Sequence, residues 1–149
     1  DNLTRADSAA FLQRAFGHFS DVHVWTAHSA DIAWMYLRGI TTGWDMGGGR
    51  YEYRPANGIV RSDLNTFMTR IRVGSYTSGT GGLNRAQFAR ILAQASGAAQ
   101  SSDTAAVAWM INKRLTDATS YAQYSPGSAL VRCDTAAFLH RAYDKALFR

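Results

Sequence analysis

The chain has 149 residues, of which 46% are hydrophobic and 18% charged, and its formal net charge is +5. This composition excludes a disordered chain and allows a core that needs no metal or disulfide. No apolar run is long enough to span a membrane. The positive charge favours an anionic partner, and composition leaves nucleic acid, an acidic polysaccharide and a membrane surface open.

One sequence pattern that opens with an arginine occurs four times along the chain. Apolar residues stand six and seven positions after each arginine, and an acidic or amide residue stands two positions after it. This spacing places the apolar residues on one face of an amphipathic helix. The opening arginines are Arg5, Arg61, Arg85 and Arg132.

The residues before these helices predict how each helix starts. Asn84 with Gln87, and Thr4 with Asp7, match the reciprocal capping arrangement that satisfies the first free amides of a helix. Valine stands at the corresponding cap position before Arg61 and Arg132. There we expect Asp63 and Asp134 to complement the helix start, or Ser62 to move the cap along the chain.

A second type of helix precedes two of the arginine helices. Segments 31–35 and 106–110 resemble each other, and the loops that follow them end alike, in a Tyr-x-Pro triplet at 53–55 and 124–126. Proline forces an extended approach to the next helix. The expected repeat unit is therefore a helix, a loop, an extended stretch and the arginine helix.

We therefore expect one repeat domain over residues 1–149. In chain order it has the closing helix of a first repeat (1–16), a full repeat (19–72), a degenerate repeat (83–96) and a shortened repeat (103–143). The degenerate repeat lacks its first helix because residues 73–82 are rich in Gly, Ser and Thr. This loss predicts one incomplete groove between repeats, and so fewer functional sites than repeats.

The full repeat resembles the S-layer homology (SLH) repeat, in a divergent form. Three elements carry the resemblance: an aromatic-x-Asp-Val start at 19–22, a Gly-Ile-x-x-Gly turn at 39–43, and a proline before the arginine helix. Thr4-Arg5-Ala6-Asp7 also matches the opening of the family's helix. About half of the chain carries such diagnostic residues.

The resemblance implies an all-α fold, with SLH-like helical repeats in a pseudo-threefold bundle with extended loops. It implies a noncatalytic, extracellular module that anchors a larger surface protein or secreted enzyme to an anionic secondary polysaccharide of the Gram-positive cell wall. No cofactor or metal is expected. The ligand-binding residues carried over from the family are Arg5, Arg61, Arg85, Arg132, Asp21 and Trp44. The pattern departs at Ser29, which follows His28 where the family has tryptophan. The turn aromatic is kept as Trp44, so the resemblance is compatible with an anionic glycan related to the pyruvylated sugars of well-studied members but different from them, and whether pyruvylation is recognised stays open.

The residues themselves leave a structural alternative open. Each arginine fork beside free helix-start amides is suited to a carboxylate or phosphate. It is equally suited to pair with a nearby aspartate such as Asp21 and to hold neighbouring repeats together. The alternative is therefore a structural or protein-interaction repeat without glycan binding.

Other chemistries find less support in the sequence. The chain has no recognised nucleic-acid-reading motif. His23 and His28 lack a third metal ligand at a recognisable spacing, and Cys133 is expected to be a packing residue. Aromatic residues around the glycines at 47–49, Trp44 among them, are expected to offer faces on which a sugar ring can stack.

Overall fold

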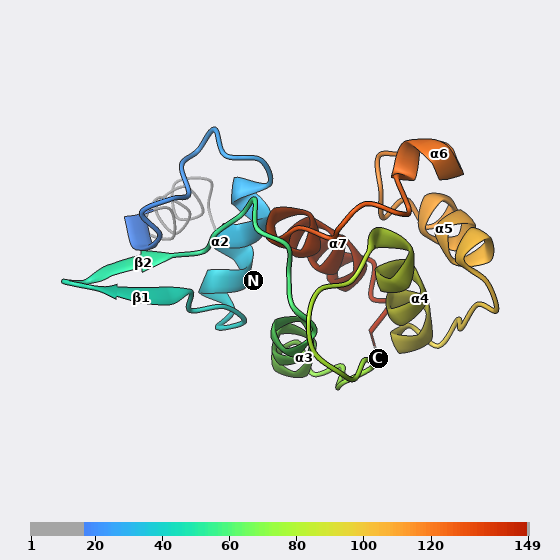
Figure 1. Cartoon of the computed structure of the whole chain (residues 1–149), viewed down its shortest axis with the longest axis horizontal. Helices are drawn as coiled ribbons and strands as arrows, with labels where there is room; N and C mark the ends of the chain where they lie inside the picture. Colours follow the sequence, from blue (N-terminus) through green and yellow to red (C-terminus); the bar gives the residue numbers. More distant parts are fainter. Residues whose placement is uncertain (1–16, 149) are drawn as a thin grey trace.

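The computed structural model describes residues 17–148, and these residues form a mixed α/β fold (Figure 1). Figure 1 shows α2 and a β-hairpin at one end, α4, α5 and α6 at the other, and α3 and α7 between them. The elements are α2 (Ser29–Leu37), β1 (Trp44–Gly47), β2 (Arg50–Glu52), α3 (Arg61–Arg70), α4 (Arg85–Ala95), α5 (Asp103–Asn112), α6 (Tyr121–Tyr124) and α7 (Arg132–Asp144).

The expectation of an all-α pseudo-threefold bundle is wrong. Strands β1 and β2 pair antiparallel, with Trp44 opposite Glu52, and the helices pack chiefly as two pairs, α2 with α7 and α4 with α5. The hairpin forms because the three glycines at 47–49 all adopt positive φ, which lets the chain reverse tightly. The sequence analysis placed these glycines in a loop but did not predict the two strands on either side of them.

Three extended segments pair with one another just before α3, α4 and α7. Isolated bridges join Gly58 to Val131, Val60 to Gly82 and Asn84 to Ala129. At the centre of each segment lies a buried residue: Ile59, Leu83 or Leu130. The segments therefore bring the starts of the three arginine helices together, and the expected extended stretch before each helix is present.

The helix faces agree with the predicted periodicity. The apolar residues six and seven positions after Arg61, Arg85 and Arg132 are all buried: Phe67, Met68, Ile91, Leu92, Phe138 and Leu139. Residues 73–82 form no helix, as their composition predicts. The boundaries of the four repeats remain predictions, and the proposed closing helix at 1–16 lies outside the described residues.

The helix starts differ in how they are capped. Asn84 and Gln87 form the expected capping box. Val60 and Val131 make no side-chain cap, and the expectation that Asp63 and Asp134 act chiefly at the helix starts is incomplete, because both pair with arginines of other helices. Among residues 17–148, no helix has the length and apolar character needed to cross a bilayer.

Candidate functional site

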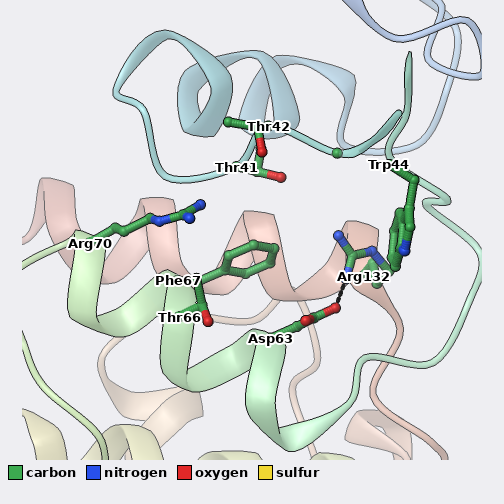
Figure 2. Close-up of a pocket in the computed structure, with 9 residues that line it drawn as sticks. Thr41, Thr42, Trp44, Asp63, Thr66, Phe67, Arg70 and Arg132 are labelled. Carbon is green, nitrogen blue, oxygen red and sulfur yellow. Dashed lines mark hydrogen bonds and ion pairs between the residues drawn. The ribbon is translucent and has the colours of Figure 1, made fainter. Parts of the chain in front are cut away.

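A pocket of about 200 Å³ lies where α3 and α7 meet the segment that follows α2 (Figure 2). Its lining combines two arginines, an aspartate, three threonines and two aromatic rings. The lining residues are Thr41, Thr42, Gly43, Trp44, Asp63, Thr66, Phe67, Arg70 and Arg132. The pocket therefore offers charge, hydroxyl groups and apolar surface within one concavity.

Arg132, the first residue of α7, is the most buried charged side chain of this pocket, at 3% exposure. Its Nε donates to the backbone oxygen of Tyr53 at 2.8 Å, and its Nη1 donates to Oδ2 of Asp63 at 2.8 Å. Figure 2 shows one of its nitrogens pointing toward the space between Thr41 and Phe67. The guanidinium is thus held by the protein on one side and faces the pocket on another.

Aromatic rings surround the same guanidinium. Its central carbon lies 4.3 Å from the ring centre of Trp44, 4.7 Å from that of Tyr53 and 5.3 Å from that of Phe67. Each such contact contributes about 0.5–2 kcal/mol, more when water is excluded. The rings therefore fix the plane of the guanidinium and shield its charge from solvent.

Trp44 also contacts a second cation. The guanidinium carbon of Arg54 lies 4.3 Å from the centre of the same indole ring. Two like charges at equal distance from one ring repel least when they occupy opposite faces. Trp44 therefore lines the pocket while its ring is occupied by protein cations, which disagrees with the expectation that its faces are free to stack on a sugar.

Asp21 has a different role from the one predicted. Its two carboxylate oxygens accept hydrogen bonds from the backbone N–H groups of Tyr53 (2.9 Å) and Arg54 (2.8 Å). Arg54 adopts a left-handed backbone with φ of 62°, and these bonds stabilise that turn. Asp21 therefore positions the loop that carries Tyr53, and it is not among the pocket-lining residues.

A second pocket of about 150 Å³ repeats the arrangement around Arg85. The Nε of Arg85 donates to the backbone oxygen of Tyr124 at 2.7 Å, and its Nη1 donates to Oδ2 of Asp134 at 2.8 Å. Its guanidinium carbon lies 4.6 Å from the Tyr124 ring and 5.2 Å from the Phe138 ring. The partners of Arg85 and Arg132 occupy equivalent positions in the sequence. Tyr53 and Asp63 stand eight positions before and two positions after Arg61, and Tyr124 and Asp134 stand eight positions before and two positions after Arg132.

We call the set of contacts that a helix-opening arginine makes with other segments its joint. The joint of Arg61 lacks the aspartate. Its Nη1 donates to the hydroxyl of Thr77 at 2.7 Å, and Thr77 precedes Arg85 by eight residues, as the tyrosines precede their arginines. Gln87 stands at the position of the aspartate, and its Oε1 accepts a hydrogen bond from the backbone N–H of Asn84 in the capping box. Within residues 17–148, Arg61 has no carboxylate partner. Gln87 belongs to the segment 83–96, which the sequence analysis predicts as a degenerate repeat.

A histidine–aspartate network extends from the second pocket. His28 contacts Asp134 through Nε2 at 3.3 Å and Asp31 through Nδ1 at 3.5 Å, while Nδ1 of His140 lies 2.8 Å from Asp31. Hydrogen bonds to Asp134 and Asp31 raise the pKa of His28 to about 9, so the imidazole is protonated at neutral pH. The sequence reading treated His28 as an ordinary loop or capping residue. It is the N-terminal cap residue of α2 but makes no side-chain cap bond.

Cys133 lies beside Arg132 and is buried. Burial raises the pKa of its thiol to about 11, so the neutral thiol dominates at neutral pH and is a poor nucleophile. This agrees with the expected packing role. Across the part of the chain that the structure describes, no group of three or more His, Cys, Asp or Glu side chains has the geometry of a metal site.

Of the predicted site residues, Arg132 and Trp44 lie together in one pocket and Arg85 lies in the other. Arg61 and Asp21 make structural contacts away from both, and Arg5 lies outside the described residues. Sequence reasoning did not assign Asp63, Phe67 or Arg70 to the site. Their signal was present in the repeat, because Asp, Phe and Arg stand two, six and nine positions after both Arg61 and Arg132.

Comparison of the chain with protein-family models, curated proteins and solved structures gives no match.

Proposed function

We propose that this protein is a noncatalytic wall-binding module of the S-layer homology type, and that it binds an acidic group of a cell-wall polysaccharide in the pocket around Arg132. The observation that carries the proposal is a buried guanidinium, held by Asp63, the Tyr53 backbone oxygen and three aromatic rings, that borders an open, polar pocket. A cation fixed in this way pays little entropy when it binds an anion.

The charges of the pocket select the kind of anion. Arg132 and Arg70 are positive, and Asp63 compensates one of them. A group with a single negative charge, such as a sugar carboxylate, would balance the remainder. Thr41, Thr42 and Thr66 place hydroxyl groups at the same pocket, and such groups exchange hydrogen bonds with sugar hydroxyls.

The proposal also includes where the protein acts and that it is part of a larger protein. A wall-binding module acts outside the cell, as part of a larger surface protein or secreted enzyme. The SLH-like start, turn and proline of residues 19–55 support this assignment, together with the net charge of +5.

The test is co-sedimentation of the purified protein with Gram-positive cell-wall sacculi, before and after chemical removal of the secondary polymer. We expect binding that disappears with the polymer and weakens roughly tenfold in Arg132→Lys, which keeps the charge but loses the planar fork. Trp44→Ala should weaken binding as well, because Arg132 loses its stacking partner. Arg90→Gln serves as the control, since Arg90 is exposed on α4 and pairs with Asp103 away from the pocket.

One observation favours the structural alternative. Arg132 and Arg85 both form ion pairs at 2.8 Å with an aspartate of a different helix, which is the pairing expected of residues that join repeats. In that case the protein would bind no native wall, while Arg132→Lys would lower stability only. Sacculi that fail to sediment the folded wild-type protein would make this alternative the better account.

A further inference from the structure

A second, strongly cationic pocket lies on the other side of Arg70. It measures about 270 Å³ and is lined by Arg38, Ile40, Arg70, Ile71, Arg72 and Tyr143. Arg70 lines this pocket and the Arg132 pocket alike, so the two are adjacent. Figure 2 shows the Arg70 side chain extending from α3 toward the segment that follows α2.

Two of the three arginines are positioned by neutral groups. Arg38 donates a hydrogen bond to the Tyr143 hydroxyl, and its guanidinium carbon lies 4.7 Å from the centre of the Tyr143 ring. The Nη1 of Arg70 donates to the backbone oxygen of Ile40 at 3.0 Å. These contacts orient the guanidinium groups and leave their charges uncompensated.

The lining of this pocket contains no carboxylate. Within residues 17–148, none of Arg38, Arg70 and Arg72 forms an ion pair, whereas Arg54, Arg85, Arg90, Arg132 and Arg141 each pair with an acid. Three like charges that share one concavity repel one another, and an anion between them removes that repulsion.

Arg72 also adopts an unfavourable backbone. Its φ is 77°, in the left-handed region that side chains with a Cβ atom avoid. The residue at the same place after α4 is Gly97, with φ of 76°, which is the usual choice for the end of a helix. Arg114 stands at the same place after α5, also with a positive φ (58°), but lies outside this pocket. The place of Arg72 in the pocket lining, beside two further arginines, therefore indicates that its charge is used there, and its backbone conformation by itself does not.

We propose that this pocket, the Arg38–Arg70–Arg72 pocket, binds a phosphate group of the wall polymer, next to the carboxylate held at Arg132. Arg70 is shared with the Arg132 pocket, so Arg38 and Arg72 supply the additional positive charge here. A phosphate offers more acceptor oxygens and more charge than a carboxylate, which suits these guanidinium groups with no acid in the pocket lining. The ligand class is thus a phosphate-bearing anionic glycan that crosses both pockets at Arg70. The glycan assignment rests on the proposed function, whereas phosphate binding at these arginines does not.

The experiment is calorimetric titration of the folded protein with a poly(glycerol phosphate) oligomer at fixed ionic strength. The variants are Arg72→Gly and Arg38→Gln, and the matched control is Arg114→Gly. Arg114 is exposed, follows α5 with a left-handed φ of 58°, and lies outside the Arg38–Arg70–Arg72 pocket. Arg72→Gly relieves the strained backbone, so its thermal midpoint should equal or exceed that of the wild type.

We expect affinity to fall roughly tenfold in Arg72→Gly and in Arg38→Gln, and to stay within about twofold of the wild type in Arg114→Gly. Equal losses in all three variants would mean that only net charge matters, and unchanged affinity in Arg72→Gly and Arg38→Gln would mean that the pocket is not used. Either result overturns the proposal.

A second titration, with a single-stranded DNA oligomer of equal charge, separates a glycan from a nucleic acid. Tight DNA binding that is lost in the same two variants would overturn the assignment to a wall glycan. The sacculi experiment tests the proposed function separately. If Arg132→Lys loses wall binding while Arg72→Gly binds poly(glycerol phosphate) as tightly as the wild type, the proposed function stands and the phosphate proposal is wrong. If Arg132→Lys keeps wall binding while Arg72→Gly loses affinity for poly(glycerol phosphate), phosphate binding stands and the proposed function is wrong.

Discussion

The joints of Arg132 and Arg61 both form around the arginine that opens a helix, but different groups surround the two guanidiniums. Both arginines open a helix, and both contact the residue that stands eight positions before the opening arginine of another helix. At Arg132 that residue is Tyr53, and Asp63 supplies a carboxylate. At Arg61 it is Thr77, which gives one hydroxyl acceptor in place of a ring and a backbone oxygen.

The arginine by itself therefore does not make the site. A guanidinium leaves water only when an acid and aromatic rings replace its hydration. Arg132 has both and is buried at 3% exposure, whereas Arg61 has neither among residues 17–148 and stays partly exposed. The helix-opening arginine is therefore necessary for the site, but the residues that other segments contribute determine whether it is buried and paired.

The largest expected effect comes from removing the acid at the Arg132 joint. Asp63→Ala leaves a buried guanidinium without its carboxylate, and we expect it to lower the free energy of unfolding by about 2–3 kcal/mol, somewhat less than for a fully buried pair. Urea denaturation measures this loss. Asp103→Ala is the matched control, because Asp103 also lies in the first turn of a helix but pairs with exposed Arg90. Equal losses in both variants would show that Asp63 acts only on its helix start.

An intermediate effect is expected from pH at the Arg85 joint. The pKa of His28 rises from 6.5 to about 9 on folding, so its contribution to stability is complete below about pH 6.5 and is lost as the pH rises toward 9. The pKa of Asp134 is lowered, mainly by its hydrogen bond to His28, so its contribution is lost when the pH falls below about 4.

Stability should therefore be greatest between about pH 4 and 6.5 and fall by about 1–2 kcal/mol toward pH 9, after allowance for solvent screening. Thermal unfolding across this range measures the effect, and His28→Gln should flatten the alkaline part of the profile. His23→Gln should leave the profile unchanged, because exposed His23 stacks on Trp25 and, within the described residues, pairs with no acid. An unchanged alkaline slope in His28→Gln would contradict the assignment.

The smallest effect is expected at the Arg61 joint. Thr77→Val removes the hydroxyl that accepts from Arg61 while keeping the side-chain shape, and we expect a loss of at most about 1 kcal/mol. The measurement is again urea denaturation, compared with Thr80→Val in the same loop. A loss as large as that of Asp63→Ala would mean that the two joints are equivalent after all.

The helices and much of the site could be predicted from the sequence. Period and capping residues are local properties, so the arginine helices, the Asn84 capping box and the absence of a helix at 73–82 follow from neighbouring residues along the chain. The same repeat columns that predict the buried faces also contain Asp63 and Phe67, which proved to surround the arginine of another repeat.

Which segment surrounds which arginine could not be predicted from the sequence, because it depends on how the elements pack. Asp63 meets Arg132, 69 residues away in the chain, because the paired extended segments bring the helix starts together. The same long-range arrangement places the Asp21 carboxylate at a backbone turn, brings two arginines to 4.3 Å from the Trp44 ring centre, and places Arg38, Arg70 and Arg72 in one pocket. Contacts between segments distant in sequence depend on how the elements pack, and no local pattern of residues specifies that packing.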